Sequence, residues 1–292
     1  MKKKRLKNKY PRKYGEILLG AITWAAALLM TAVLLYIIGF IVYRGAPYLK
    51  PSLFSPTYNS TNVSLLPALV STVYMTAFAL AVALPLGLGA AIYLAEYARR
   101  GHKVVRLIRL ATETLAGIPS IIHGLFGMLF FVTYLGWGFS LLAGVCTLAI
   151  MILPLIMRAS EEALLAAPDS YREGAFALGA GKLRTVFRIV LPAAAPGILA
   201  GVILSVGRIV GETAALIYTA GTVAQMPFAE GGPPLIDVFA SVRTLSVHMY
   251  ALTREGLHTN EGFATALTLL AVVMGINAAA AWMAGRVGKN RS

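Results

Sequence analysis

Residues Glu161 to Pro192 read "EEALLAAPDSYREGAFALGAGKLRTVFRIVLP", a segment too polar to cross a membrane and too regular to be a linker. Ser170 is the expected N-cap of a first helix, because Glu173 follows at the spacing of a capping box. The "GAG" sequence at Gly179 favours left-handed backbone, which would end that helix. A second, amphipathic helix is expected over Lys182–Val190. Its apolar side chains are Leu183, Val186, Phe187 and Val190. We therefore predict a short helix, a glycine turn and a helix that lies on the face of a membrane.

The chain on both sides of this segment is apolar. Of its 292 residues, 58% are hydrophobic and 13% are charged, and its mean hydropathy is +0.74. A soluble domain carries roughly 25% charged residues, whereas a membrane-spanning helix needs about 20 apolar residues in a row. We predict an all-α membrane protein with six transmembrane helices. The spans are expected at Ile17–Tyr43, Leu65–Ala95, Thr112–Leu135, Phe139–Met157, Ala193–Thr219 and Phe263–Gly285.

The domain boundaries follow from these spans. We expect a basic cytoplasmic N-terminus (1–16), a first transmembrane helix with an external loop (17–64), a core of five transmembrane helices (65–285) and a cytoplasmic tail (286–292). The core includes the polar loop 161–192, between the fourth and fifth spans. The third span is expected to break near its start, at "GIPS" (117–120), because proline interrupts a helix.

The chain has a net charge of +14, and the positions of its basic residues follow a membrane topology. Basic residues gather before the first span, in 99–109, in 158–188 and after the last span, and these segments hold 21 of the 26 lysines and arginines. This is the positive-inside pattern of a multi-pass protein with both termini in the cytoplasm. The lipid bilayer, rather than nucleic acid, is thus the predicted partner of this charge. The first span is longer than the apolar part of a signal peptide, which favours a retained anchor.

Two charges lie in the fifth predicted span, in "SVGRIVGETAAL", which begins at Ser205. They are Arg208 and Glu212, and they are expected to share one helical face with Ser205 and Thr219. The four-residue spacing would let the two charges pair. An arginine near the middle of a membrane costs about 2.5–3.5 kcal/mol on insertion scales, so it calls for a structural or functional reason.

Two interpretations of this pair remain open. It is either a buried ion pair that orients the helix or a polar pathway for an anion. The planar fork of Arg208 suits a tetrahedral oxyanion, and a nearby carboxylate at Glu212 would weaken the grip so that the anion could leave. Glycines spaced for close helix packing accompany the pair, namely Gly197 with Gly201 and Gly207 with Gly211.

Two further residues are candidates for the pathway. His123 either packs in the interior or lines the pathway, because one histidine without a partner decides neither. Arg158, at the end of the fourth span, either meets the exiting anion or anchors the helix to lipid headgroups. The four histidines lack metal-ligand spacing and no catalytic cluster is apparent, so neither a metal site nor an enzyme is expected.

The polar loop resembles the EAA loop of ABC-importer permeases. The matching positions are Glu173, Gly174, Ala175, Gly179, Ile189, Leu191 and Pro192. Gly174 stands where the family usually has alanine. The resemblance implies a type I ABC-importer permease fold, in which this loop is the coupling helix that docks on a cytoplasmic ATPase. The "GAGK" sequence at 179–182 is no phosphate loop, because Phe176 and Leu183 occupy positions that need glycine and Ser or Thr. We expect no cofactor in this chain, with ATP used by the partner.

Two other segments narrow the resemblance. "GRIVGETAALIYTAG" (207–221) and "LAGIPSIIHGLFGMLFF" (115–131) resemble the PstA-type permease subunit of bacterial phosphate ABC importers. That resemblance implies passage of inorganic phosphate past Arg208 and Glu212 in the bacterial cytoplasmic membrane. It also implies three partners: a related PstC-type permease subunit, a PstB-type ATPase dimer and an external PstS-type phosphate-binding protein, for which loop 221–261 is a candidate surface.

Other functions are less well supported. The chain could instead be a permease for sulfate, molybdate or phosphonate. Only the resemblance to phosphate permeases favours phosphate over these oxyanions. A secondary transporter would be expected to show inverted repeats, and none is convincing here. A membrane enzyme would need a catalytic cluster that the sequence does not supply.

Overall fold

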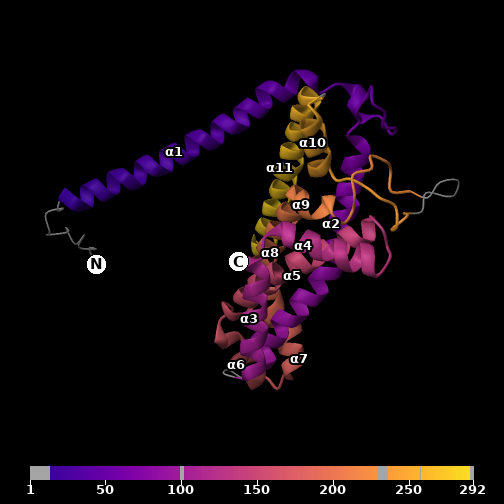
Figure 1. Ribbon diagram of the computed structural model, residues 1–292. Helices are drawn as coiled ribbons and strands as arrows, with labels where there is room; N and C mark the ends of the chain where they lie inside the picture. The colour runs from indigo at the N-terminus through magenta and orange to yellow at the C-terminus, as the bar shows by residue number, and fades with distance from the viewer. Residues whose placement is uncertain (1–13, 99–101, 229–235, 257, 290–292) are drawn as a thin grey trace.

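The protein is described here by a computed structural model, which covers residues 14–98, 102–228, 236–256 and 258–289 (Figure 1). The basic segment expected at the N-terminus lies mostly outside these residues, as does the end of the tail. The described chain is almost entirely helical. Its helices are α1 Tyr14–Gly45, α2 Leu66–Ile92, α3 Lys103–Gly117, α4 Ser120–Gly127, α5 Leu141–Leu165, α6 Asp169–Ala177, α7 Lys182–Thr185, α8 Leu191–Gly211, α9 Ala214–Ile217, α10 Leu245–Glu255 and α11 Thr259–Lys289. Short π-helical segments follow α2, α4 and α7, at Tyr93–Tyr97, Met128–Tyr134 and Val186–Val190.

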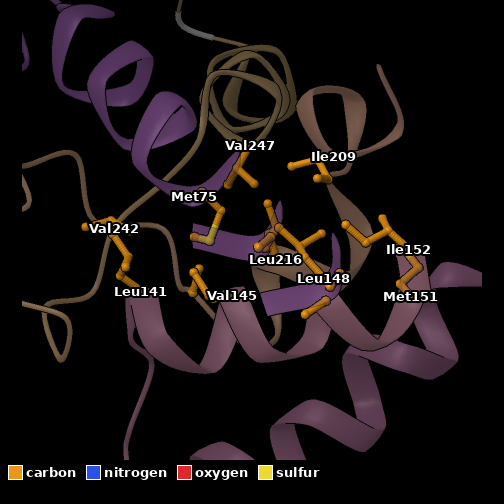
Figure 2. Packing of buried hydrophobic residues seen from close by; sticks show 14 of the residues in the cluster. Met75, Leu141, Val145, Leu148, Met151, Ile152, Ile209, Leu216, Val242 and Val247 are labelled. Atoms are coloured by element: carbon orange, nitrogen blue, oxygen red, sulfur yellow. The ribbon is translucent and has the colours of Figure 1, made fainter. Parts of the chain in front are cut away.

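The centre of the bundle is α5, which packs against α2 on one side and α8 on the other. Figure 2 shows Met75 of α2, Leu148 and Ile152 of α5, Ile209 of α8 and Leu216 of α9 in one buried cluster. Burial of these side chains does not by itself favour the bundle inside a membrane, because lipid is as apolar as leucine. Close packing and hydrogen bonds between the helices must hold them together instead.

Five of the described helical runs are long and apolar enough to cross a membrane, and a sixth exists only as a bent pair. That pair is α3 with the run Ser120–Tyr134, and the two parts meet at 100°. The predicted break at "GIPS" is confirmed, because α3 ends at Gly117 and α4 begins after Pro119. The predicted third span, Thr112–Leu135, corresponds to this bent pair, and its first residues, up to Gly117, belong to the amphipathic α3.

The polar loop departs from the prediction in two ways. The first helix, α6, has Pro168 as its N-cap, without a side-chain hydrogen bond, so the capping box at Ser170 is wrong. The second helix does not end at Val190, because Lys182–Gly211 forms one continuous helical run into the membrane. Pro192 fits within this run because it follows the π-helical segment Val186–Val190, where the α-helical hydrogen-bond pattern is already interrupted. The left-handed turn is confirmed, with φ of +80° at Gly179.

Small residues bring α8 close to α5. A Cβ atom on Gly197 would lie 2.7 Å from the Cβ of Ala163, and one on Gly201 would collide with the Cβ of Ala159. The first predicted glycine pair therefore packs two helices together. Gly207 and Gly211 face open space within the described structure.

The first helix stands apart from the bundle. Figure 1 shows α1 as a long arm that leaves the bundle near the start of α11. At that junction Gly45 packs against the backbone of Phe263, and the Phe40 and Phe263 rings meet edge to face at 5.6 Å. The most apolar part of α1 is entirely unburied within the chain. This helix therefore needs lipid or another protein chain around it.

The contact between α5 and α8 can be tested by placing alanine at Gly201. Alanine has a better helix preference than glycine, but its methyl group has no room in this contact. Gly201→Ala should lower stability by about 1–3 kcal/mol, because overpacking outweighs the better helix preference of alanine. Gly207→Ala is the matched control, and it should be neutral or stabilising because nothing lies within 4 Å of its Cβ. Thermal unfolding in detergent measures both. Adding Ala159→Gly to Gly201→Ala should restore stability, and failure of that rescue would contradict the contact.

Candidate functional site

Arg208 lies in an apolar groove of about 770 Å³ between α8 and α11, with one edge on α5. Its other lining residues are Leu155, Ala200, Ile203, Leu204, Gly207, Asn277 and Ala281. The arginine is half-buried, and no ion pair to it is found among the described carboxylates. The groove thus presents one cation and one amide, from Asn277, in otherwise apolar surroundings. Such a site is suited to an anion that must pass between chains or helices.

Glu212 does not share a helical face with Arg208, so that prediction is wrong. The helix α8 ends at Gly211, and Glu212 has an extended backbone with ψ of 127°. Its carboxylate accepts a hydrogen bond of 3.0 Å from the backbone N–H of Ala215, at the start of α9. Its own carbonyl oxygen accepts a 2.6 Å bond from the Ser246 hydroxyl. Glu212 is thereby held at the helix break, and the expected pairing with Arg208 is not formed.

The other predicted pathway residues within the membrane core are buried. The Ser205 hydroxyl donates to the Gly201 carbonyl and the Thr219 hydroxyl to the Ala215 carbonyl, so both are satisfied one turn back along the chain. His123 lies in α4, 6% exposed, with Nδ1 at 3.4 Å from the carbonyl oxygen of Pro119. In this structure none of the three lines the Arg208 groove, and their pathway role stays a prediction.

Arg158 lies near the polar end of α5, where acidic side chains surround it. Its Nε contacts the Glu162 carboxylate at 3.2 Å, and both side chains are exposed. Arg158 and Glu162 line a small cavity together with Arg109, Glu113 and Glu161. The carboxylates of this cavity therefore outnumber its arginines. The Arg109 guanidinium pairs with Glu161 at 2.5 Å and ties α3 to α5. An anion would meet net negative charge here, which favours an anchoring role for Arg158 over substrate contact.

The predicted coupling residues gather at the end of the bundle formed by α6 and α7 (Figure 1). Glu173 and Gly174 are exposed on α6, whereas Ala175 is buried against the bundle. Ile189 and Pro192 line a cavity of about 740 Å³ between α5 and the entry to α8. Leu191 packs on the buried cluster nearby.

Large apolar side chains are exposed around the same turn. They are Tyr171, Phe176, Leu178, Leu183 and Phe187, and Leu178 is 90% exposed. The sequence predicted Leu183 and Phe187 on one side with Val186 and Val190, but only the two valines are buried. An apolar patch of this kind at a loop tip is typical of a surface that another protein covers.

One residue that fixes this loop was missed in the sequence. Arg172 of α6 reaches Glu96, after α2, with nitrogen–oxygen distances of 2.6 and 3.1 Å, and donates to the carbonyls of Leu164 and Ala167 at 2.9 Å each. Hydrogen bonding to the Glu96 carboxylate raises the pKa of Arg172. Glu96 is only 7% exposed, so the pair is desolvated. The only sequence signal was the arginine beside Glu173, and nothing local points to a partner 76 residues away.

Solved structures with a similar shape include ABC importers. The chain of the bacterial alginate ABC transporter, in complex with an alginate-bound periplasmic protein, matches with a TM-score of 0.62 at 15% identity over 95% of this chain and 98% of that chain. A chain of the MetNI methionine ABC transporter matches with a TM-score of 0.59 at 21% identity, over 76% of this chain and 94% of that chain. At these identities the likeness concerns the fold, which is the type I ABC-importer permease fold, as predicted.

Residues 83–290 match the model of the family described as binding-protein-dependent transport system inner membrane component. The chain is 32% identical to the probable ABC transporter permease protein YqgI of Bacillus subtilis (strain 168), over 95% of this chain and 98% of that protein. It is 36% identical to the phosphate transport system permease protein PstA 1 of Mycobacterium tuberculosis (strain ATCC 25618 / H37Rv), over 73% of this chain and 67% of that protein. The PstA of Yersinia pestis is 34% identical over 75% of this chain and 74% of that protein.

The chain belongs to this family of inner-membrane transport components, and it is an ABC-importer permease of PstA type. The resemblance seen in the sequence is therefore confirmed, as is the multi-pass membrane location.

Loss of the Arg172–Glu96 pair is expected to destabilise the loop around α6 and to lower substrate uptake. Arg172→Gln should lower stability by about 3–5 kcal/mol, because it leaves the buried Glu96 carboxylate unpaired. Arg106→Gln, an exposed arginine of α3 outside this loop, is the control and should behave as wild type. Thermal unfolding in detergent measures the stability, and substrate uptake by the assembled transporter measures the transport activity. Wild-type unfolding and uptake in Arg172→Gln would show that the pair does not hold the coupling loop.

Proposed function

We propose that this chain is one of two permease subunits that form the path for inorganic phosphate in an ATP-driven importer, by alternating access. The observation that carries the proposal is Arg208, a cation without a carboxylate partner among the described residues, in an apolar groove that reaches α11. A guanidinium offers two parallel N–H donors to a tetrahedral oxyanion. The several PstA proteins among the relatives support phosphate over other oxyanions.

The separation of Arg208 from Glu212 supports a transport role over a purely structural one. If the arginine served only to orient helices, the nearby carboxylate would be its natural partner. Instead the Glu212 carboxylate caps α9, which leaves the Arg208 guanidinium available. Gly207 beside it adds no side chain to the groove, so an anion can approach the backbone closely.

The proposed partners occupy different surfaces. The exposed apolar side chains around α6 are suited to a groove on an ATPase dimer of PstB type, which supplies the ATP chemistry that this chain does not perform. The unburied arm α1 and the open groove at Arg208 are suited to a related PstC-type permease subunit. The opposite end of the bundle, with loop 221–261, would receive phosphate from an external PstS-type binding protein. Part of that loop lies outside the described residues.

The orientation in the bacterial cytoplasmic membrane can be tested by labelling. Both termini and α6 are expected in the cytoplasm, because the basic segments lie on that side. In a Cys146→Ala background, an impermeant thiol reagent should label Ser60→Cys in whole cells and miss Ser170→Cys. Both positions are exposed in the structure, so access to the side chain is not limiting. The reverse pattern would invert the topology.

Arg208 gives the sharpest test of the transport path. Arg208→Gln should lower phosphate uptake about 10- to 100-fold, the loss expected for one charged hydrogen-bond donor. The double variant Arg208→Gln, Glu212→Gln should not recover uptake, because the oxyanion still lacks the guanidinium. Assembly with the partner subunits and uptake in vesicles are measured together, with Arg106→Gln in α3 as the control for loss of an exposed charge.

Two outcomes would contradict the proposal. Near wild-type phosphate uptake by a well-assembled double variant would remove Arg208 as a required contact. Competition by sulfate or molybdate that exceeds competition by phosphate would assign the transporter to another oxyanion.

A further inference from the structure

A second buried arginine lies near the outer end of the bundle, just before α10. Arg243 is 6% exposed, yet its Nε and Nη2 atoms have no hydrogen-bond partner in the structure. No carboxylate of the described residues lies within ion-pair distance of it. One face of the guanidinium stacks on the Tyr58 ring, with Cζ 4.5 Å from the ring centroid. The unpartnered edge is the one that carries two parallel N–H groups.

His248 shares this environment. It is fully buried in α10, and its ring meets Tyr58 edge to face at 6.0 Å. Neither ring nitrogen makes a hydrogen bond of ordinary length and angle, and only a weak polar contact with the Val63 backbone remains. Burial, with the nearby positive charge of Arg243 as the second cause, lowers the pKa of His248 to about 3. The imidazole is therefore neutral at neutral pH, with one N–H to donate. Arg243 supplies the positive charge and His248 a further donor.

The segment that covers these residues is strained. Val63 has φ of +38°, the only positive φ of a non-glycine residue in the described chain, and a β-branched side chain is poorly suited to it. Val63 is 3% exposed and packs with Leu53, Leu65 and Leu245 in the outer cluster. Strain of this kind persists where the surrounding structure enforces it, and it collects at functional sites.

The buried pair is connected to the end of the Arg208 helix. Thr244 and Ser246 follow Arg243, with their hydroxyls 3.0 Å apart, and the Ser246 hydroxyl donates to the Glu212 carbonyl at the break after α8. Tyr58, on the other side, also lines an outer cavity of about 620 Å³. Arg243 thus lies between an outer cavity and the helix that carries Arg208.

We infer that Arg243 and His248 form an outer site for a tetrahedral oxyanion, which the anion occupies before it reaches Arg208. Two of its oxygens would accept from the Nε and Nη2 N–H groups, and a third from the imidazole. A buried cation without a counter-charge is costly, and such an anion removes that cost. The two nitrogens are closed to solvent here, so the structure holds this site closed, and movement of Tyr58 with the strained segment 53–65 opens it. The inference rests on the proposed import of an oxyanion.

The first experiment separates a binding site from a structural clamp. Arg243→Met keeps the unbranched stem of the side chain as far as the position of Nε and removes the unpaired charge. It should raise the unfolding temperature of the assembled transporter in detergent while phosphate uptake falls about tenfold or more. If Arg243 instead has only a structural role, through its stacking on Tyr58, Arg243→Met should lower the unfolding temperature. Loss of unfolding temperature together with uptake, or unchanged uptake, would overturn the inference. Arg106→Gln, an exposed arginine in α3 and far from this site in the sequence, is the control.

The second experiment distinguishes the outer site from the Arg208 path. Hydrogen exchange of residues 53–65 is measured in the assembled transporter with inorganic phosphate, against chloride at equal ionic strength. Phosphate should change the exchange in wild type and in Arg208→Gln, but not in Arg243→Met. An unresponsive wild type, or a response that survives Arg243→Met, would overturn the outer site. A response to sulfate in place of phosphate would keep the site and refute the phosphate assignment.

Discussion

The close contact of α8 with α5 is the constraint on which the rest of this structure depends. In a bilayer, helices gain little from burying apolar side chains, so their association relies on backbones that approach closely. Gly197 and Gly201 allow that approach against Ala163 and Ala159. Farther along the same helix the next two glycines face no neighbour, and the groove of Arg208 opens there. One helix therefore packs closely on α5 through its first glycine pair and leaves one face open at Arg208.

The same contact links the coupling loop to the site. The loop α6 joins α5 to the continuous run Lys182–Gly211, and Arg172 fixes it to the ends of α2 and α5. Arg208 lies about 39 Å from Lys182 along this run, at 1.5 Å per residue. Because the run is helical throughout and held to α5 by small residues, a displacement at α6 is carried to Arg208 by rigid elements. No separate relay of side chains is needed.

Much of this could be predicted from the sequence, because membrane spans and topology depend on local composition. The break at "GIPS", the positive φ at Gly179 and the close glycine pair all follow from residues adjacent in the chain. The predictions that were wrong depended on distant residues. The four-residue spacing of Arg208 and Glu212 implies pairing only if the helix continues, and it ends at Gly211, where Ser246, from a later segment, bonds the Glu212 carbonyl. Arg172 with Glu96, and Arg243 with Tyr58, likewise join segments that no sequence period connects.

The unburied arm α1 has a consequence for how the subunit is made. This helix is apolar enough to enter the bilayer as soon as it emerges from the ribosome, and it meets the remainder of its own chain chiefly at one end. It is then free to diffuse against a neighbouring subunit while the other helices are still being synthesised. A subunit made in excess of its partner would leave the arm and the Arg208 groove facing lipid. That is a signature a membrane protease can recognise, so the cellular level of this chain would follow the supply of its partner.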